Sequence, residues 1–197
     1  MSRSVEVVAT QIAGTIRFRG DASSKMNAIL RKLQGTDRRS IGRVGEVVRE
    51  VLAEPSLFGV VFEGMLADDP VMRMRCADAV EKITLEHPKY LLPYKKLLFQ
   101  QMSKINQQEV RWHVAQLFSR MKLSRRERRI LVGILQDYLR DESKIVKTFA
   151  MQALADIAEK DIQLRAGILK QIEELTRTGS PAMKSRGRKL LAKLKPK

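Results

Sequence analysis

The hydrophobic positions of the chain recur at helical spacing over almost its whole length. Apolar residues return at intervals of three, four and seven, helix-forming residue types dominate, and strand-like alternation is scarce. Breaks fall at regular places, and several place an Asp or Ser before a proline that suits a first helical turn, as at Asp69-Pro70. Pro93 lies inside one predicted helix and should kink it. The pattern predicts an all-α fold.

Within this pattern a repeat of about 12 residues can be aligned without gaps. Each of the four clear copies begins with an apolar residue followed by a basic one, and these copies start 38, 36 and 37 residues apart. The four copies and a weaker fifth are 72–83 (MRMRCADAVEKI), 110–121 (VRWHVAQLFSRM), 146–157 (VKTFAMQALADI), 183–194 (MKSRGRKLLAKL) and 40–51 (SIGRVGEVVREV). A second amphipathic stretch lies between successive copies, which predicts one helix pair every 35–40 residues.

The repeat resembles the HEAT repeat, a unit of two antiparallel helices that stacks into an α-solenoid. The resemblance is carried by a turn acid or amide that precedes the apolar-basic start of the second helix. These positions are Asp68-Asp69 with Met72-Arg73, Asn106 with Val110-Arg111, and Asp141 with Val146-Lys147. The resemblance covers roughly residues 22–197, and the last copy departs from it because Gly179-Ser180 replace the turn acid. It implies a right-handed α-α superhelix of about five helix pairs.

We therefore expect a single repeat domain over residues 1–197, because one helix pair cannot bury its own apolar face and must stack on others. Its parts would be a capping segment at 1–21 and repeats at about 22–53, 54–86, 87–122, 123–160 and 161–197. Segment 4–18 could be a capping helix or, because of its β-branched residues, a strand. The position that faces the next pair holds Ala77, Ala115 and Met151, but Arg188 in the last copy, which predicts a polar cap there.

Charge and cysteine content narrow the class of protein. The chain has 38 Lys and Arg against 22 Asp and Glu, and the excess lies in residues 1–43 and 122–197. Such a charge attracts polyanions, although it could also simply solubilise a helical surface. The only cysteine, Cys76, allows no internal disulfide, and no stretch resembles a signal peptide or a membrane span. We expect a cytoplasmic protein without membrane contact.

Helical geometry sorts the faces of the second helices. In 110–121 the residues Val110, Val114, Leu117, Phe118 and Met121 fall on one side and should form core. Trp112 points away from them, and the resemblance implies that this face is concave. We expect Arg111 to bond a turn acid and His113 to be an ordinary surface residue. The predicted ligand-binding residues are Trp112, Arg75, Lys82, Arg120, Arg186, Lys189 and Lys193.

A second candidate is the densest basic run, KLSRRERRI at 122–130. Its arginines open a predicted helix, where positive charge opposes the helix dipole, so they either contact a partner or form a solvated face. The four residues of this basic cluster are Arg125, Arg126, Arg128 and Arg129.

Catalytic motifs are absent from the sequence. There is no phosphate-binding glycine loop, no GxSxG and no HExxH, so neither a cofactor nor a metal is expected. One enzyme class, the HEAT-like DNA glycosylases, remains a remote alternative. Those enzymes place a carboxylate one turn from a tryptophan, where this chain has Gln116, and a neutral amide cannot stabilise a developing cation.

The sequence thus favours a non-enzymatic binding or scaffold module for an anionic macromolecule, with nucleic acid ahead of an acidic protein. Lys and Arg would supply salt-dependent affinity, whereas the low aromatic content of 5% disfavours base stacking on single strands. The alternative is a protein–protein scaffold whose charge is incidental.

Overall fold

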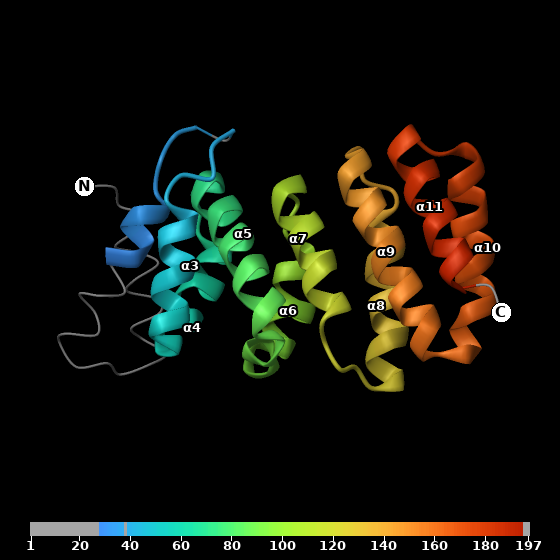
Figure 1. Ribbon diagram of the computed structural model, residues 1–197, viewed down its shortest axis with the longest axis horizontal. Helices are drawn as coiled ribbons and strands as arrows, with labels where there is room; N and C mark the ends of the chain where they lie inside the picture. The colour runs from blue at the N-terminus through green and yellow to red at the C-terminus, as the bar shows by residue number, and fades with distance from the viewer. Residues whose placement is uncertain (1–27, 38, 195–197) are drawn as a thin grey trace. The chain divides into compact units, whose positions relative to one another are not determined.

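The computed structural model describes residues 28–37 and 39–194, so the question of helix or strand at 4–18 lies outside the described part. This part is all-helical and contains no strand (Figure 1). The chain divides into two compact units, residues 1–94 and 95–197. The division falls inside the stretch predicted as the first helix of the third repeat. There the backbone forms the 3-10 helix η3 (Pro88–Tyr94) and then the short helix α6 (Lys95–Gln100), with Pro93 inside η3.

The N-terminal unit is organised around the 17-residue helix α5 (Pro70–Glu86). This helix packs against α3 (Val44–Ala53), α4 (Phe58–Glu63), η2 (Gly64–Leu66) and η3, while η1 (Pro55–Leu57) packs against α3 and α4. Asp69 begins α5 by accepting a hydrogen bond from the Val71 backbone N–H at 2.8 Å. Met72, Cys76, Val80 and Ile83 form its fully buried stripe.

An aromatic cluster joins α4 to η3 within the same unit. The rings of Phe62 and Tyr94 lie 4.5 Å apart between centroids, and the ring of Phe58 meets that of Tyr90 edge-on at 5.3 Å. These are favourable separations for aromatic pairs. The cluster holds the irregular segment after α5 against the core.

The C-terminal unit contains α6, the 3-10 helix η4 (Met102–Lys104), α7 (Gln108–Ser119), α8 (Arg125–Tyr138), α9 (Lys144–Lys160), α10 (Ile162–Thr178) and α11 (Pro181–Leu194). The hairpins α8–α9 and α10–α11 fall within the predicted repeats 123–160 and 161–197. Helix α9 is central, since it packs against α7, α8, α10 and α11 (Figure 1).

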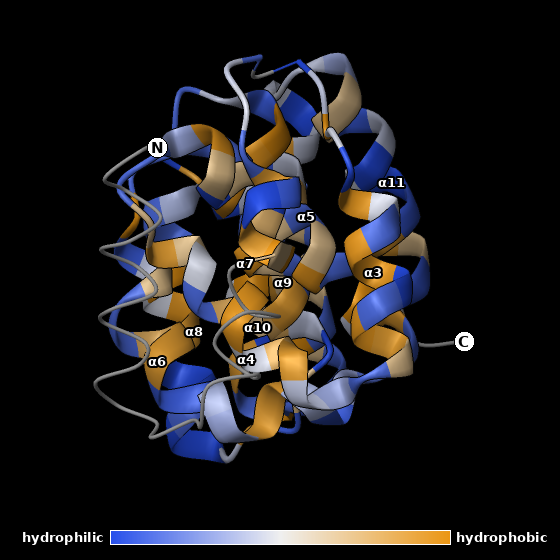
Figure 2. Cartoon of the chain, turned by 90° about the vertical axis from the view of Figure 1, so that its left-hand side faces the viewer, coloured by the Kyte–Doolittle hydropathy of each residue, from blue (hydrophilic) through white to orange (hydrophobic). Residues whose placement is uncertain are grey.

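The predicted core of α7 is confirmed. Its five members, Val110, Val114, Leu117, Phe118 and Met121, are all buried. Ala115 and Met151 are also fully buried, whereas Arg188 at the equivalent position of α11 is exposed. Helices carry both hydrophobic and hydrophilic residues along their length, as amphipathic helices do (Figure 2). No helix in residues 28–37 and 39–194 has the length and apolar character needed to cross a bilayer.

Close approach of α10 and α11 depends on Gly187. This glycine is buried, and a Cβ at this position would fall on the side chain of Thr176, whose hydroxyl donates to the Ile172 carbonyl at 2.6 Å. Gly167 on α10 is the opposite case: it is exposed, and a Cβ there would meet nothing within 4 Å.

Substitution of these two glycines should change the free energy of unfolding in opposite directions. Gly187→Val should lower the free energy of unfolding by about 1–3 kcal/mol, because the new side chain overpacks the contact between α10 and α11. Gly167→Ala should raise it by about 0.5–1 kcal/mol, because alanine restricts the unfolded chain without a clash. Urea unfolding followed by circular dichroism measures both. A neutral Gly187→Val would contradict the close packing.

Candidate binding surface

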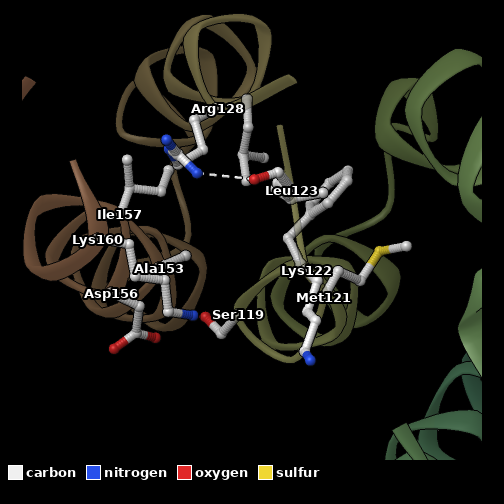
Figure 3. Close-up of a pocket in the computed structure, with 11 residues that line it drawn as sticks. Ser119, Met121, Lys122, Leu123, Arg128, Ala153, Asp156, Ile157 and Lys160 are labelled. Atoms are coloured by element: carbon white, nitrogen blue, oxygen red, sulfur yellow. Dashed lines mark hydrogen bonds between the residues drawn. The ribbon is translucent and has the colours of Figure 1, made fainter. Parts of the chain in front are cut away.

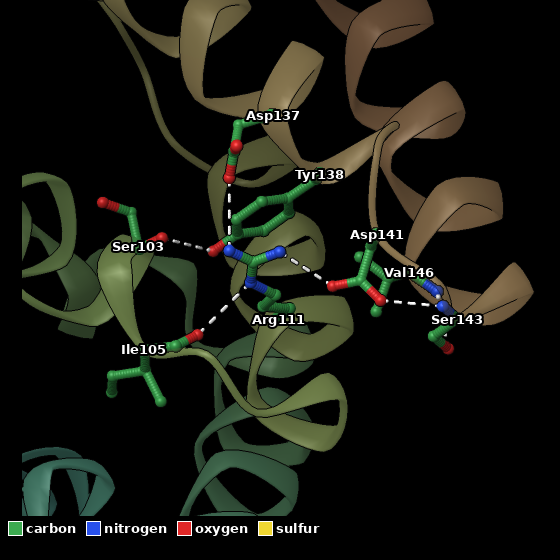
Figure 4. A network of polar contacts seen from close by, with 8 residues as sticks. All are labelled: Ser103, Ile105, Arg111, Asp137, Tyr138, Asp141, Ser143 and Val146. Carbon is green, nitrogen blue, oxygen red and sulfur yellow. Dashed lines mark hydrogen bonds and ion pairs between the residues drawn. The ribbon is translucent and has the colours of Figure 1, made fainter.

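The first turn of α7 is held by a polar network around Arg111 (Figure 4). One guanidinium nitrogen lies 2.8 Å from Asp141 and another 3.2 Å from Asp137, while Nε donates to the Ile105 carbonyl at 3.3 Å. The guanidinium also lies over the ring of Tyr138, 4.9 Å from its centroid. Arg111 therefore joins the loop before α7, the end of α8 and the loop before α9. Its bond to a turn acid is the one that the sequence predicts.

Two partners of Arg111 are themselves fixed. The Tyr138 hydroxyl donates to the Ser103 carbonyl at 3.0 Å, and burial raises the pKa of this phenol, an effect that the charge of Arg111 offsets only in part. Asp141 accepts a hydrogen bond from the Ser143 backbone N–H at 2.8 Å. Tyr138 is therefore neutral near pH 7, and the network is preorganised.

Arg73 occupies the same slot in the N-terminal unit. Its guanidinium donates to the Ala67 carbonyl at 2.7 Å, six residues upstream, just as Arg111 donates to Ile105 six residues upstream. Both basic residues thus bind the loop that precedes their own helix. The basic position of the repeat is structural in both units.

Trp112 and Gln116 of α7 are half-buried, as the sequence predicts for Trp112. The Gln116 amide donates to the Trp112 carbonyl at 3.4 Å and supplies no acid beside the indole. The expectation that His113 lies at the surface is wrong, because its side chain is buried. His113 follows Val110 by three residues and precedes Leu117 by four, which places it beside the buried stripe.

The corresponding residues of α9 and α11 bind one another. Arg186 donates to the Gln152 side-chain oxygen at 2.8 Å and lies 5.8 Å from the centroid of the Phe149 ring. Gln152 in turn donates to Asp156 at 3.0 Å. At the end of α11 Lys193 pairs with Glu159 at 2.7 Å, and this hydrogen bond raises the pKa of the lysine. Lys189 is exposed, and Arg120 is half-exposed at the end of α7.

The expectation for Arg75, that its guanidinium is available to a ligand, must be corrected. Arg75 is buried in α5 and donates to the backbone carbonyls of Ser40 at 3.0 Å, Asp37 at 3.2 Å and Gln34. It also lies against Gly42, whose φ of +56° favours glycine. Arg75 therefore holds the loop between residues 34 and 42. Lys82, on the same helix, pairs with Asp78.

Arg128 likewise departs from the expectation of an exposed basic cluster. It is half-buried, pairs with Asp161 at 2.9 Å and donates to the Leu123 carbonyl at 2.7 Å. Its three neighbours Arg125, Arg126 and Arg129 are exposed. The helix start tolerates them because Ser124 and Glu127 form a capping box, in which the Ser124 backbone N–H donates to Glu127 at 2.7 Å and lowers the pKa of that carboxyl.

An apolar pocket of about 290 Å³ lies in the C-terminal unit, between the ends of α7 and α9 and the start of α8 (Figure 3). Sequence reasoning missed it, because its lining residues belong to three helices and to the loop 120–124.

The excess charge is distributed unequally between the two units. Residues 95–197 contain 24 Lys and Arg against 10 Asp and Glu, whereas residues 1–94 contain 14 against 12. Almost all of the net charge of +16 therefore belongs to the C-terminal unit.

Comparison of the chain with protein-family models, with curated proteins and with solved structures found no match. Over residues 28–37 and 39–194 no group of three or more His, Cys, Asp or Glu side chains is placed to hold a metal ion. Cys76 is buried, and burial raises the pKa of its thiol.

The Arg111 network predicts a large loss of stability on mutation. The Arg111 and Asp141 side chains are only 13% and 11% exposed, so Arg111→Met should cost about 2–4 kcal/mol by leaving two carboxylates without their cation. The exposed pair of Arg177 with Glu174 is the control, and Arg177→Met should leave the free energy of unfolding almost unchanged. Equal losses in denaturant unfolding would contradict the structural role of Arg111.

The pair of Arg128 with Asp161 predicts a pH dependence. The hydrogen bond from Arg128 lowers the pKa of the Asp161 carboxyl, so its stabilisation is present above the unfolded value of about 4 and is lost as pH falls through the folded pKa. Asp161→Asn keeps the cap of α10 but removes the charge. The difference in Tm from the native chain should be largest at pH 7 and should shrink as the pH falls below about 4. A difference that does not change with pH would contradict the charge contribution of this pair.

Proposed function

We propose that the chain is a non-enzymatic binding module whose C-terminal unit holds nucleic acid through its phosphates. The observation that carries this proposal is the unequal charge of the two units, 24 cations against 10 acids in residues 95–197. Lysine and arginine that neutralise phosphates release counterions, which gives strong binding without reading sequence.

Among the exposed cations of the C-terminal unit, two groups lie close together along single helices. Arg125, Arg126 and Arg129 lie on the first turns of α8, and Arg188 and Lys189 lie on α11, a helix that contains no acidic residue. Scarce aromatic residues favour contact with a phosphate backbone over base stacking. Double-stranded nucleic acid is therefore the expected form.

We also propose that the helix pairs belong to a right-handed α-α superhelix of HEAT type in a cytoplasmic protein. Two observations support the repeat. Arg73 and Arg111 bind their preceding loops at the same spacing, and the hairpins α8–α9 and α10–α11 start 37 residues apart. A single buried cysteine suits a reducing compartment.

A second candidate function is a scaffold that binds protein. It is favoured by the internal pairing of several predicted ligand-binding cations: Arg186 with Gln152, Lys193 with Glu159 and Lys82 with Asp78. The first two pairs lie on α9 and α11, which with the half-buried Trp112 of α7 form a mixed polar face of the kind typical of protein binding. Its charge would then serve solubility.

Salt-dependent binding distinguishes the two functions. The full chain should shift a random 20-base-pair duplex at low salt, and the affinity should fall steeply between 50 and 200 mM salt. Changing Arg125, Arg126 and Arg129 to Ala should weaken binding and reduce the slope of log K against log salt by up to about 3. The matched triple change of Arg39, Arg49 and Lys89 in the N-terminal unit alters net charge equally and should leave the slope unchanged. No shift at low salt would reject the nucleic-acid function.

A further inference from the structure

The pocket of the C-terminal unit has an apolar floor and a charged rim. Its apolar residues come from the end of α7, the following loop, α8 and α9 (Figure 3). They are Phe118, Met121, Leu123, Leu131, Ala153 and Ile157. Polar groups surround this floor: Lys122 and Lys160 are exposed, Arg128 closes one side, and Ser119 and Asp156 lie opposite Arg128.

The pocket is small and its walls are fixed. Its volume of about 290 Å³ lies just below the roughly 300–1,000 Å³ of sites for drug-sized ligands, and suits one large side chain. Arg128 is held at both ends, by the Leu123 carbonyl at 2.7 Å and by Asp161 at 2.9 Å. A ligand therefore meets a preformed cavity, which lowers the entropy lost on binding.

The charge around the pocket determines which kind of peptide segment can enter it. Lys122 and Lys160 present exposed ammonium groups at the rim, and Arg125, one turn before Arg128, adds another exposed cation. Of the carboxylates near the pocket, Asp161 pairs with Arg128, whereas Asp156 accepts from the neutral amide of Gln152 and keeps its negative charge. The three exposed cations outnumber it. The surroundings thus favour negative charge, whereas the floor offers nothing to a phosphate.

We propose that this pocket is an anchor site for an acidic peptide segment of a partner protein. One large aliphatic or aromatic side chain enters the cavity, and the carboxylates that flank it in the peptide meet Lys122, Lys160 and Arg125. This inference rests on the proposed function as a binding module for an anionic macromolecule, with an acidic protein as that macromolecule. It does not require binding of nucleic acid.

Matched peptides test the anchor. Fluorescence polarisation of the full chain would compare 12-residue peptides of Asp, Glu, Ser and Gly that differ only in a central Leu, Phe or Ala. The Leu or Phe peptide should bind about ten-fold or more tightly than the Ala peptide, as expected from burying one large apolar side chain. Equal affinities would overturn the proposal.

Substitutions in the pocket distinguish the contribution of its apolar floor to peptide binding from that of its charged rim. Ser119→Phe fills the cavity and should abolish the advantage of the Leu and Phe peptides. If Ser119→Phe disturbs folding, Leu123→Ser takes its place, because it keeps the backbone carbonyl that Arg128 needs. This smaller change should reduce the advantage of the Leu and Phe peptides. A double change of Lys122 and Lys160 to Glu should weaken all peptides, and the same change at Lys144 and Lys170 should weaken them much less. Asp156→Asn should strengthen binding, and no response to any of these changes would overturn the site.

A duplex competitor distinguishes failure of this inference from failure of the proposed function. Duplex binding without any preference for anchored peptides would overturn the pocket alone. Absence of both duplex and peptide binding would overturn the pocket and the proposed function together. Duplex binding that Ser119→Phe abolishes would assign the pocket to nucleic acid and overturn the peptide proposal. Anchored-peptide binding that survives a saturating duplex would support it.

Discussion

The C-terminal unit depends on one partly buried guanidinium, that of Arg111. Three helix ends converge on it: the loop before α7 through Ile105, the end of α8 through Asp137 and Tyr138, and the loop before α9 through Asp141. A partly buried charge destabilises a fold unless it is paired and hydrogen-bonded, and here each of the three guanidinium nitrogens has a partner. Apolar packing holds the middles of these helices, and this side chain holds their ends.

The need to pair each buried guanidinium limits which basic residues are available to a partner. Arg73 and Arg75 are bonded to backbone carbonyls, while Arg111 and Arg128 are bonded to both carbonyls and acids. The sequence predicts Arg75 and Arg128 as binding residues but Arg111 as a partner of a turn acid, although a guanidinium suits either purpose. A count of basic residues therefore overstates the number of cations that a partner could reach.

Sequence periodicity identified the large apolar residues of the α7 core, because a 3.6-residue pattern depends only on the geometry of that helix, but it missed the buried His113. It also placed Trp112 at the half-buried edge and Arg111 beside a turn acid. The prediction failed at Arg75. This residue lies on the polar face of its helix, but a loop about 35–40 residues away in sequence covers it. Periodicity could not show the pocket, because no single helix contains it. The sequence predicts the direction in which a side chain points from its own helix. The neighbours that the side chain meets there depend on tertiary contacts.

The unequal charge of the units is not required by their folding. The two halves have nearly the same number of acids, 12 and 10, but 14 and 24 cations, and both are built from amphipathic helices with aliphatic cores. Ten additional cations in one unit increase its self-repulsion and contribute nothing to its apolar packing. The N-terminal half shows that such helices can pack with nearly balanced charge. The proposed anionic partner would supply what the C-terminal unit lacks, because its negative charge would offset this repulsion in the complex.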